Sequence, residues 1–314
     1  MTAPQTTARG PETTLQTTLE TVSPHNSTSD RSFSDVSTPR LRPTPSFHRR
    51  LPRFIRAKRS HRPPLALQDR DLDLLRTAYE YRLITTPQFL QLYRDDSKDG
   101  IYRRLQKLFH HGYLDRIGTN PNAPMLYALA RRGADVLEVP VRKEVGDGYV
   151  PHQLMIGNAR IALTLAANEE KLAFTWKTFD GRDSPVRPDG FFSLQFPDLP
   201  EGRNRAFFML EADRSTMTRE RFVQKLVAYQ GWCDAGGHTA KLGIKNFRVL
   251  TVTRSEERLR SLVSAAAGSG GIRRDLARFW FTSETRFTPP SGSAILGAIW
   301  ETADRPGHSQ SLLP

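Results

Sequence analysis

Residues 83–111 read LITTPQFLQLYRDDSKDGIYRRLQKLFHH, and this stretch predicts two consecutive helices. The first begins at Thr85, whose hydroxyl can cap it, and Pro87 follows in the first turn, where a helix needs no amide donor from proline. The second covers residues 98–111, in which apolar residues recur at helical spacing, so that one face is buried. The remaining faces carry a cluster of basic side chains, namely Lys98, Arg103, Arg104, Lys107 and His110.

The chain on either side of this helix pair completes a pattern typical of a winged helix-turn-helix. Apolar residues at helical spacing predict a helix over residues 72–79, before the pair. Two short strands are expected after it, at residues 113–117 and 125–129, with a turn-rich loop between them and a closing helix behind. Residues 65–139 are therefore predicted to bind DNA through the major groove, with the second helix of the pair as the reader. The alternative is a three-helix bundle whose basic face is merely solvated.

The residues before this domain, 1–64, are predicted to be a disordered tail in two parts. The first forty are dense in Thr, Ser and Pro, and too poor in large apolar residues to fold alone. Residues 40–62 hold nine Arg/Lys and no acid, which predicts a flexible arm that binds DNA by releasing counterions. A plain linker and a targeting peptide are the alternatives, although the prolines of the arm would break an amphipathic targeting helix. The candidate DNA contacts of the arm are Arg49, Arg50, Arg53, Arg56, Lys58 and Arg59.

Bulk properties agree with a nucleic-acid partner. The formal net charge of +13 over 314 residues favours binding to a polyanion, and the length allows about two domains with tails. A single cysteine, Cys233, excludes an internal disulfide framework and suits a reducing compartment. No apolar run reaches the ~18 residues of a membrane helix, and no secretory signal is recognisable. We therefore expect a cytoplasmic protein whose partner is DNA, without a membrane association; its oligomeric state stays open.

A short charged linker leads to a second domain, predicted over residues 149–303 with an α/β fold. A helix is expected over residues 151–170 and a last strand or closing segment over 294–300, with a frayed end after Asp304. The other expected elements are strands at 174–179, 191–196, 206–213, 246–253 and 278–282, and helices at 218–235 and 256–267.

The strand at 206–213 ends in two carboxylates, Glu211 and Asp213, which point to one face of the sheet because side chains alternate along a strand. Carboxylates at the end of a buried strand are costly unless they are paired, hydrogen-bonded or bound to a cation. Asp189, at the start of the preceding strand, is expected to lie across from them. Three such carboxylates would suit Mg²⁺ or Mn²⁺, and Lys225 on the following helix is predicted to reach them. Purely structural roles are expected for His152, Tyr229 and Cys233.

In this order the elements resemble the core of the PD-(D/E)xK nucleases, a restriction-endonuclease-like fold. A wider resemblance rests on Lys225, Tyr229 and the stretches 83–89, 127–129, 132–134, 187–190 and 208–216. By these residues the chain, from about residue 65, resembles the bacterial and plasmid replication-relaxation family, which joins an N-terminal winged helix to a nuclease-like domain. The resemblance implies an α+β protein that acts in plasmid replication or in DNA relaxation for transfer, with replication or relaxosome proteins as further partners.

One departure from the nuclease pattern keeps two functions open. The superfamily has a lysine two residues after the second acid, where this chain has Asp213. If Lys225 replaces that lysine, the resemblance implies a Mg²⁺- or Mn²⁺-dependent DNA endonuclease in which Asp189, Glu211 and Lys225 catalyse, while Asp189, Glu211 and Asp213 hold the metal. Otherwise the domain has kept the fold and lost cleavage, since a fold alone does not settle activity. We favour a DNA-binding accessory factor. The endonuclease is the first alternative, and a winged-helix transcription regulator is a further alternative.

Overall fold

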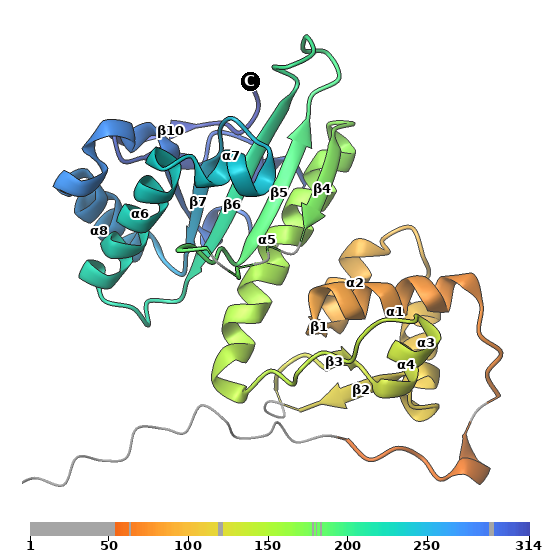
Figure 1. Cartoon of the computed structure of the whole chain (residues 1–314). Helices are drawn as coiled ribbons and strands as arrows, with labels where there is room; N and C mark the ends of the chain where they lie inside the picture. Colours follow the sequence, from red (N-terminus) through yellow and green to blue (C-terminus); the bar gives the residue numbers. More distant parts are fainter. Residues whose placement is uncertain are drawn as a thin grey trace, which may run out of the picture. The chain divides into compact units, whose positions relative to one another are not determined.

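The structure of the protein, a computed structural model, describes residues 54–62, 64–118, 122–177, 179, 181–182, 184–288 and 292–314. It is a mixed α+β protein, as the sequence predicts (Figure 1). Most of the predicted tail lies outside the described residues, and with it Arg49, Arg50 and Arg53; so does the side chain of Arg59. None of the described helices is both long and apolar enough to cross a membrane.

The first part of the described chain contains the helices and strands expected from its sequence pattern. A two-residue strand that was not predicted, β1, joins the two expected strands in a small antiparallel sheet of order β1-β3-β2. The elements are α1 (Asp69–Tyr81), β1 (Ile84–Thr85), α2 (Thr86–Leu92), α3 (Lys98–His110), β2 (Leu114–Ile117), β3 (Leu126–Leu129) and α4 (Arg131–Val136).

Local capping explains where α2 and α3 begin. The Thr85 hydroxyl accepts a hydrogen bond from the amide of Gln88 at 3.3 Å, and the Gln88 side chain accepts one from the amide of Thr85 at 2.8 Å. This reciprocal pair is a capping box, and it confirms the predicted start of α2. Ser97 caps α3 with a single hydrogen bond, which its hydroxyl accepts from the amide of Gly100 at 3.3 Å.

Packing of α3 against α1 and α2 uses the apolar face that its sequence predicts. Ile101, Leu105 and Leu108 are all fully buried, in one cluster with Leu74 and Phe89. Full burial of such a side chain stabilises the fold by about 1.5–3 kcal/mol, so this face fixes the orientation of the helix. The opposite face of α3 is thereby directed outward.

Helix α5 (Val150–Glu169) contributes to two apolar cores at once. Ile161 and Leu165 pack with the core of α1, α2 and α3, whereas Ala159 and Leu163 pack against the large sheet. A helix that is apolar on several sides is expected to be buried in this way. The division into domains at residues 65–139 and 149–303 stays a prediction.

The second half of the chain is built on a seven-stranded sheet of order β10-β9-β8-β7-β6-β5-β4. Strands β6, β7 and β8 are parallel and the other pairs are antiparallel. The strands are β4 (Ala173–Lys177), β5 (Gly190–Gln195), β6 (Arg205–Asp213), β7 (Arg248–Thr253), β8 (Phe279–Ser283), β9 (Trp300–Thr302) and β10 (Arg305–Gln310).

Helices cover both faces of this sheet, so its central strands are buried on both sides (Figure 1). Helix α5 and a 3-10 turn, η5 (Gly292–Ile295), cover one face. Helices α6 (Arg219–Asp234) and α8 (Glu256–Ala267) cover the other, and a short helix, α7 (Gly237–Leu242), follows α6. The ends of α8 match the sequence prediction.

The end of the chain corrects the prediction. Of the two alternatives for residues 294–300, a last strand or a closing segment, the strand is wrong, because β9 begins only at Trp300. The expected frayed end after Asp304 is also wrong, because strand β10 forms there. Nearly all residues of β10 are exposed, so it lacks the apolar alternation that reveals a strand in sequence.

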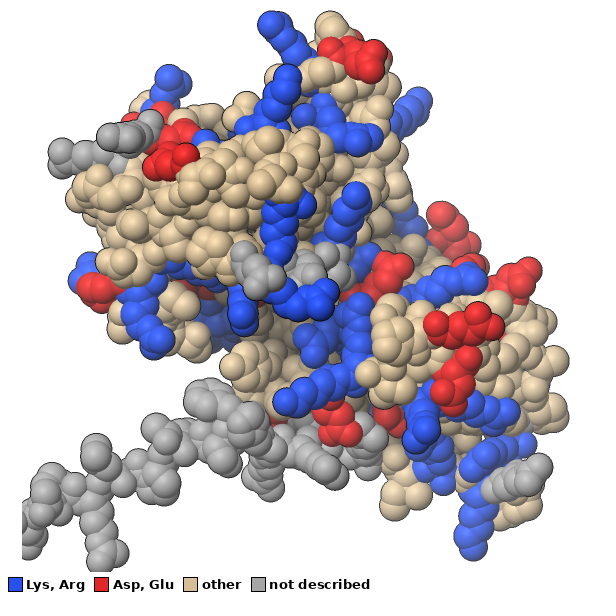
Figure 2. All heavy atoms as spheres, viewed as in Figure 1, with Lys and Arg blue, Asp and Glu red and all other residues tan. Residues whose placement is uncertain are grey.

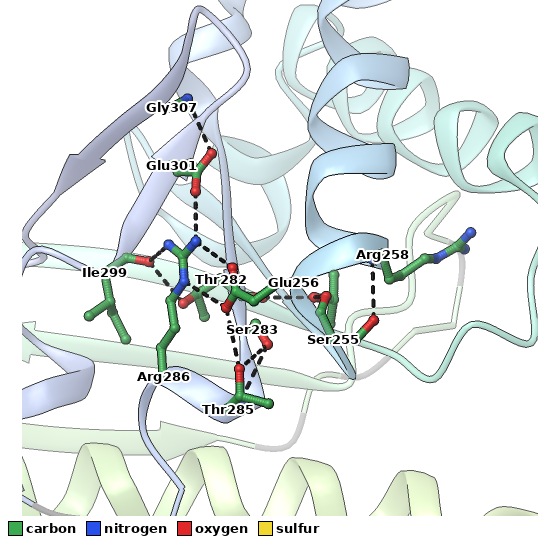
Figure 3. Close-up of polar contacts among 11 residues, drawn as sticks. Ser255, Glu256, Arg258, Thr282, Ser283, Thr285, Arg286, Ile299, Glu301 and Gly307 are labelled. Atoms are coloured by element: carbon green, nitrogen blue, oxygen red, sulfur yellow. Dashed lines mark hydrogen bonds and ion pairs between the residues drawn. The ribbon is translucent and has the colours of Figure 1, made fainter.

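A buried acid ties this last hairpin to the rest of the sheet (Figure 3). Glu301 accepts a hydrogen bond from the amide of Gly307 at 3.2 Å and one from Arg286 at 2.8 Å. The guanidinium of Arg286 also binds Glu256, at the start of α8, at 2.7 Å. Because three elements meet at Arg286, the hairpin is fixed by partners distant in the sequence.

Candidate functional site

The site begins where β5 meets β6. The amide of Asp189 donates to the carbonyl of Leu210 at 2.8 Å, and the amide of Ala212 donates to the Asp189 carboxylate at 2.9 Å. These contacts hold Asp189 beside the end of β6, which confirms its predicted position. Its predicted role stays a prediction.

Helix α6 supplies both partners of Glu211, which is only 2% exposed. The hydroxyl of Tyr229 donates to one carboxylate oxygen, and the ammonium of Lys225 contacts the other. A buried carboxylate without such partners would be strongly destabilising. The predicted reach of Lys225 is confirmed, and the pair makes Glu211 tolerable inside the protein.

Burial still changes the acidity of this cluster. It raises the pKa of Glu211 to about 7, and the nearby negative charge of Asp189 acts in the same direction, against Lys225 and Tyr229. Burial also raises the pKa of the Tyr229 hydroxyl well above its usual range, so this group remains a hydrogen-bond donor. Glu211 thus changes charge near neutral pH.

His152 completes the cluster from the first turn of α5. Its Nε2 lies 3.0 Å from a carboxylate oxygen of Asp189, and this hydrogen bond raises the pKa of the imidazole. The sequence interpretation had given His152 and Tyr229 purely structural roles. Because Tyr229 lies one turn after Lys225 on the same helix, its contact with Glu211 could have been predicted from the sequence. Nothing in the spacing of His152 and Asp189 predicts their contact.

Asp213 lies on the same face of β6 but has a different partner. Arg258 of α8 binds its two carboxylate oxygens at 2.8 and 3.0 Å, and also donates to the carbonyl of Met217 at 2.7 Å. The amide of Ser215 donates a further hydrogen bond at 2.9 Å. Asp213 is thus a satisfied, buried member of an ion pair.

The expected cluster of three carboxylates is therefore not formed. Within the part of the chain that the structure describes, no group of three or more His, Cys, Asp or Glu side chains is arranged to hold a metal ion. The physical reason is that α8 approaches Asp213 with a bidentate arginine, which a sequence reading of β6 alone does not reveal.

The outward face of α3 is a second candidate site. Lys98 and Arg103 are exposed, Lys107 is half-buried, and the ring of Tyr102 is 49% exposed among them. Arg104 departs from the prediction that it faces solvent. The guanidinium of Arg104 binds the carboxylate of Asp71, which is completely buried. The charge of Arg104 is therefore paired within the protein and is not directed at an external partner.

Part of the predicted flexible arm is held against α3 and β2. Arg56 donates to the carbonyls of Phe109 and Leu114 at 3.0 and 3.2 Å and forms an ion pair with Asp115. The amide of Ala57 donates to Nδ1 of His110 at 3.0 Å, while burial and neighbouring arginines lower the pKa of that imidazole. Arg56 and His110 thus attach residues 54–62 to the fold, and Lys58 remains exposed.

Comparison with known families gives one match. The family model described as Replication-relaxation matches residues 75–246, more than half of the chain. The matched region contains α2, α3, Asp189, Glu211 and Lys225. Neither the curated proteins nor the solved structures contain a significant match to the chain.

Proposed function

Because the chain belongs to the replication-relaxation family, which suggests a role in plasmid replication or relaxation, we propose that it acts there as a DNA-binding accessory factor without catalytic turnover. The observation that carries this proposal is the outward face of α3, where Lys98 and Arg103 are exposed next to Tyr102. Cationic side chains on one helix face provide the phosphate contacts that dominate affinity for DNA.

The elements around α3 support its assignment as a recognition helix. Three helices followed by the β2–β3 hairpin, with β1 completing the small sheet, fit a winged helix-turn-helix. In that arrangement α3 enters the major groove. The described part of the arm lies beside the C-terminal end of α3 through the contacts of Arg56 and Ala57, and its Lys58 is exposed.

The carboxylate cluster supports a role without cleavage. Both oxygens of Glu211 have partners within the protein, in Lys225 and Tyr229. Asp213, which occupies the place of the superfamily lysine, is neutralised by Arg258. Groups engaged in this way stabilise the sheet and are less available for a reacting phosphate or a metal ion.

Fluorescence anisotropy with labelled duplex DNA of mixed sequence tests the proposal. The triple variant Lys98→Ala, Arg103→Ala, Lys107→Ala is expected to bind at least about tenfold more weakly. The slope of log affinity against log salt should fall by about 2.7, from about 0.9 for each lost phosphate contact. Arg104 is left in place, because its removal would strand the buried Asp71 and disturb folding.

The matched control removes the same number of exposed cations elsewhere, through Lys245→Ala, Arg203→Ala and Arg260→Ala. It should reduce affinity only slightly, by lowering net charge. Equal affinities of the two triple variants would show that α3 is not the DNA-binding element.

A metal-dependent DNA endonuclease is the second candidate, favoured by the meeting of Asp189, Glu211, Lys225 and His152. Mg²⁺ is often held by one or two carboxylates, with water and substrate phosphate completing its shell. Asp189 fits such an ion, Glu211 would have to exchange Lys225 or Tyr229 for it, and Asp213 is held by Arg258. A bound ion would supply an activated water and charge stabilisation. Lys225 would add positive charge beside it, and His152 would hold a proton at Nε2, facing Asp189.

Two measurements separate this candidate from the first. Nicking of supercoiled plasmid in Mg²⁺ or Mn²⁺ that is lost in Asp189→Asn and in Glu211→Gln, but kept in Lys245→Ala, would establish the endonuclease. Calorimetric titration with Mn²⁺ reports on metal binding without turnover. Absence of both nicking and Mn²⁺ binding, with duplex DNA still bound, is the outcome that the accessory role predicts.

A further inference from the structure

A groove of about 660 Å³ opens beside the carboxylate cluster, bounded by the end of α1, residues 142–146, α5 and β4. His152 and Asp189 line one part of it, so it leads to the candidate site. Its volume lies in the range of about 300–1,000 Å³ that is usual for ligand pockets, and it is too small for a DNA duplex. Five cationic residues line it, namely Arg82, Arg142, Lys143, Arg160 and Lys177.

Lys and Arg outnumber the acids of this groove, which are Glu80, Glu144 and Asp189, and Arg160 already forms an ion pair with Glu80. Arg82 and Arg142 both line the groove, and burial together with the charge of Arg142 lowers the pKa of Arg82. The Nε groups of Arg82 and Arg160 are buried and have no hydrogen-bond partner in the described structure. An anion in the groove would offset the repulsion between the like charges that line it.

The backbone at Arg82 is also unusual. Its φ of 60° lies in the left-handed region, which non-glycine residues seldom adopt. Such conformations persist where surrounding contacts enforce them, and they occur often at binding sites. Here the carbonyl of Lys143 accepts a hydrogen bond from Arg82 at 3.3 Å, so the conformation aligns this cation with the loop that borders the groove.

Aromatic rings stand among the cations. Tyr149, just before α5, is 56% exposed and lines the groove. Trp176 of β4 lies beneath Arg160, whose guanidinium is 5.3 Å from the ring centroid. Positive charge interleaved with aromatic faces is the arrangement that binds single-stranded nucleic acid, with phosphates on the cations and bases on the rings.

We propose that this groove binds one unpaired strand of DNA and leads its backbone toward Asp189 and His152. The proposal rests on the proposed function only in taking DNA as the partner; it assigns a second, strand-specific site apart from α3. Arg142, Lys143 and Lys177 contact the phosphates, and Tyr149 stacks on a base. In Figure 2, Lys and Arg side chains gather around α5 and the loop that precedes it, in agreement with a cationic path there.

The test compares a labelled oligothymidylate with a duplex of equal length, on the full chain. Lys143 and Lys177 are exposed, so the double variant Lys143→Glu, Lys177→Glu should fold normally. It is expected to bind the oligothymidylate at least about tenfold more weakly, with a salt slope reduced by at least about 1.4, from about 0.7 for each lost contact to a single strand. Its affinity for the duplex should stay within about threefold of that of Lys245→Glu, Arg260→Glu, the control with the same change in net charge.

The outcomes distinguish this site from α3. If the groove variant and its control bind the oligothymidylate equally, the groove proposal is overturned while duplex binding by α3 stands. If the α3 triple variant still binds duplex normally but the groove variant loses the single strand, the groove proposal holds and the proposed role of α3 fails.

A second readout locates the strand directly. Ultraviolet cross-linking of an oligonucleotide that carries iodouracil should label Tyr149, and the label should disappear in the groove variant. Cross-links confined to aromatic residues away from the groove, such as Tyr102 on α3, would contradict the proposal.

Discussion

Two carboxylates, Glu211 and Asp213, stand two residues apart on one strand and face the same helical layer, yet their surroundings differ. Asp213 is held by the two-pronged guanidinium of Arg258, with additional hydrogen bonds around the pair. Glu211 has a lysine and a tyrosine as partners and the negative charge of Asp189 nearby. Asp213 therefore has a bidentate cationic partner, whereas Glu211 has a pKa raised to about 7 by burial and can exchange a proton near neutral pH.

The difference teaches that position on a strand does not decide the role of an acid. Arginine remains charged and matches a carboxylate with two parallel hydrogen bonds, so it locks Asp213 into a structural contact. Lysine offers a single point charge from a flexible stem, and here its side chain is 29% exposed. The ion pair of Glu211 thus keeps contact with solvent through Lys225, whereas Glu211 itself is buried.

Loss of the arginine should give the largest effect on stability. Arg258→Met is expected to destabilise the protein by about 3–5 kcal/mol, because it leaves Asp213 buried and unpaired. Lys225→Met should cost clearly less, since Glu211 can take up a proton instead. Chemical denaturation at neutral pH measures both, and the double variant Asp213→Asn, Arg258→Met should recover part of the loss. If Arg258→Met and Lys225→Met lower the free energy of unfolding equally, the proposed difference between Asp213 and Glu211 is contradicted.

The pH dependence of stability sharpens the contrast further. The pKa of Glu211 rises from 4.5 to about 7 on folding, so between these values the folded state binds a proton that the unfolded state releases. Stability from this group is thus fully present below pH 4.5 and is lost as the pH rises to about 7. Glu211→Gln removes this loss, so the variant should gain up to about 3 kcal/mol relative to the native protein across the window. A difference between the two unfolding free energies that does not change with pH would refute the raised pKa.

The smallest effect is expected from the tyrosine hydroxyl. Tyr229→Phe removes one hydrogen bond to Glu211 and should cost about 1.5 kcal/mol, the lower end for a bond to a charged group. The cost should be greatest above pH 7, where the carboxylate is ionised. Thermal or chemical denaturation checks it, with Tyr113→Phe as a control that removes a hydroxyl elsewhere. A Tyr229 variant as stable as the control would show that Lys225 alone compensates Glu211.

Sequence reasoning succeeded where the signals are local. The capped start of α2 at Thr85, the buried stripe of α3 and the limits of α8 all depend on neighbours within about one or two helical turns. The placement of Asp189 against β6 was also predictable, because adjacent antiparallel strands bring their ends together. The family resemblance is confirmed by the match over residues 75–246.

Partners distant in the sequence were not predictable in the same way. Arg104 and Asp71 are 33 residues apart, His152 and Asp189 are 37 apart, and Arg258 and Asp213 are 45 apart. Each pair depends on how a helix lies against a strand or another helix, and no periodicity encodes that. Strand β10 was missed for a related reason, since its pairing with β9 is made by backbone hydrogen bonds and its side chains are almost all exposed.

By itself, the sequence determined that the protein is a mixed α+β chain with a basic helix, a strand ending in two acids and a lysine on the next helix. Those features follow from side-chain periodicity and composition, which act along the chain. Only the tertiary structure decided three side-chain pairs: Arg104 binds the buried Asp71, Arg258 binds Asp213, and His152 lies within hydrogen-bond distance of Asp189. The reason is that the charge state of a buried group depends on which partners packing brings to it, and packing joins residues from separate elements.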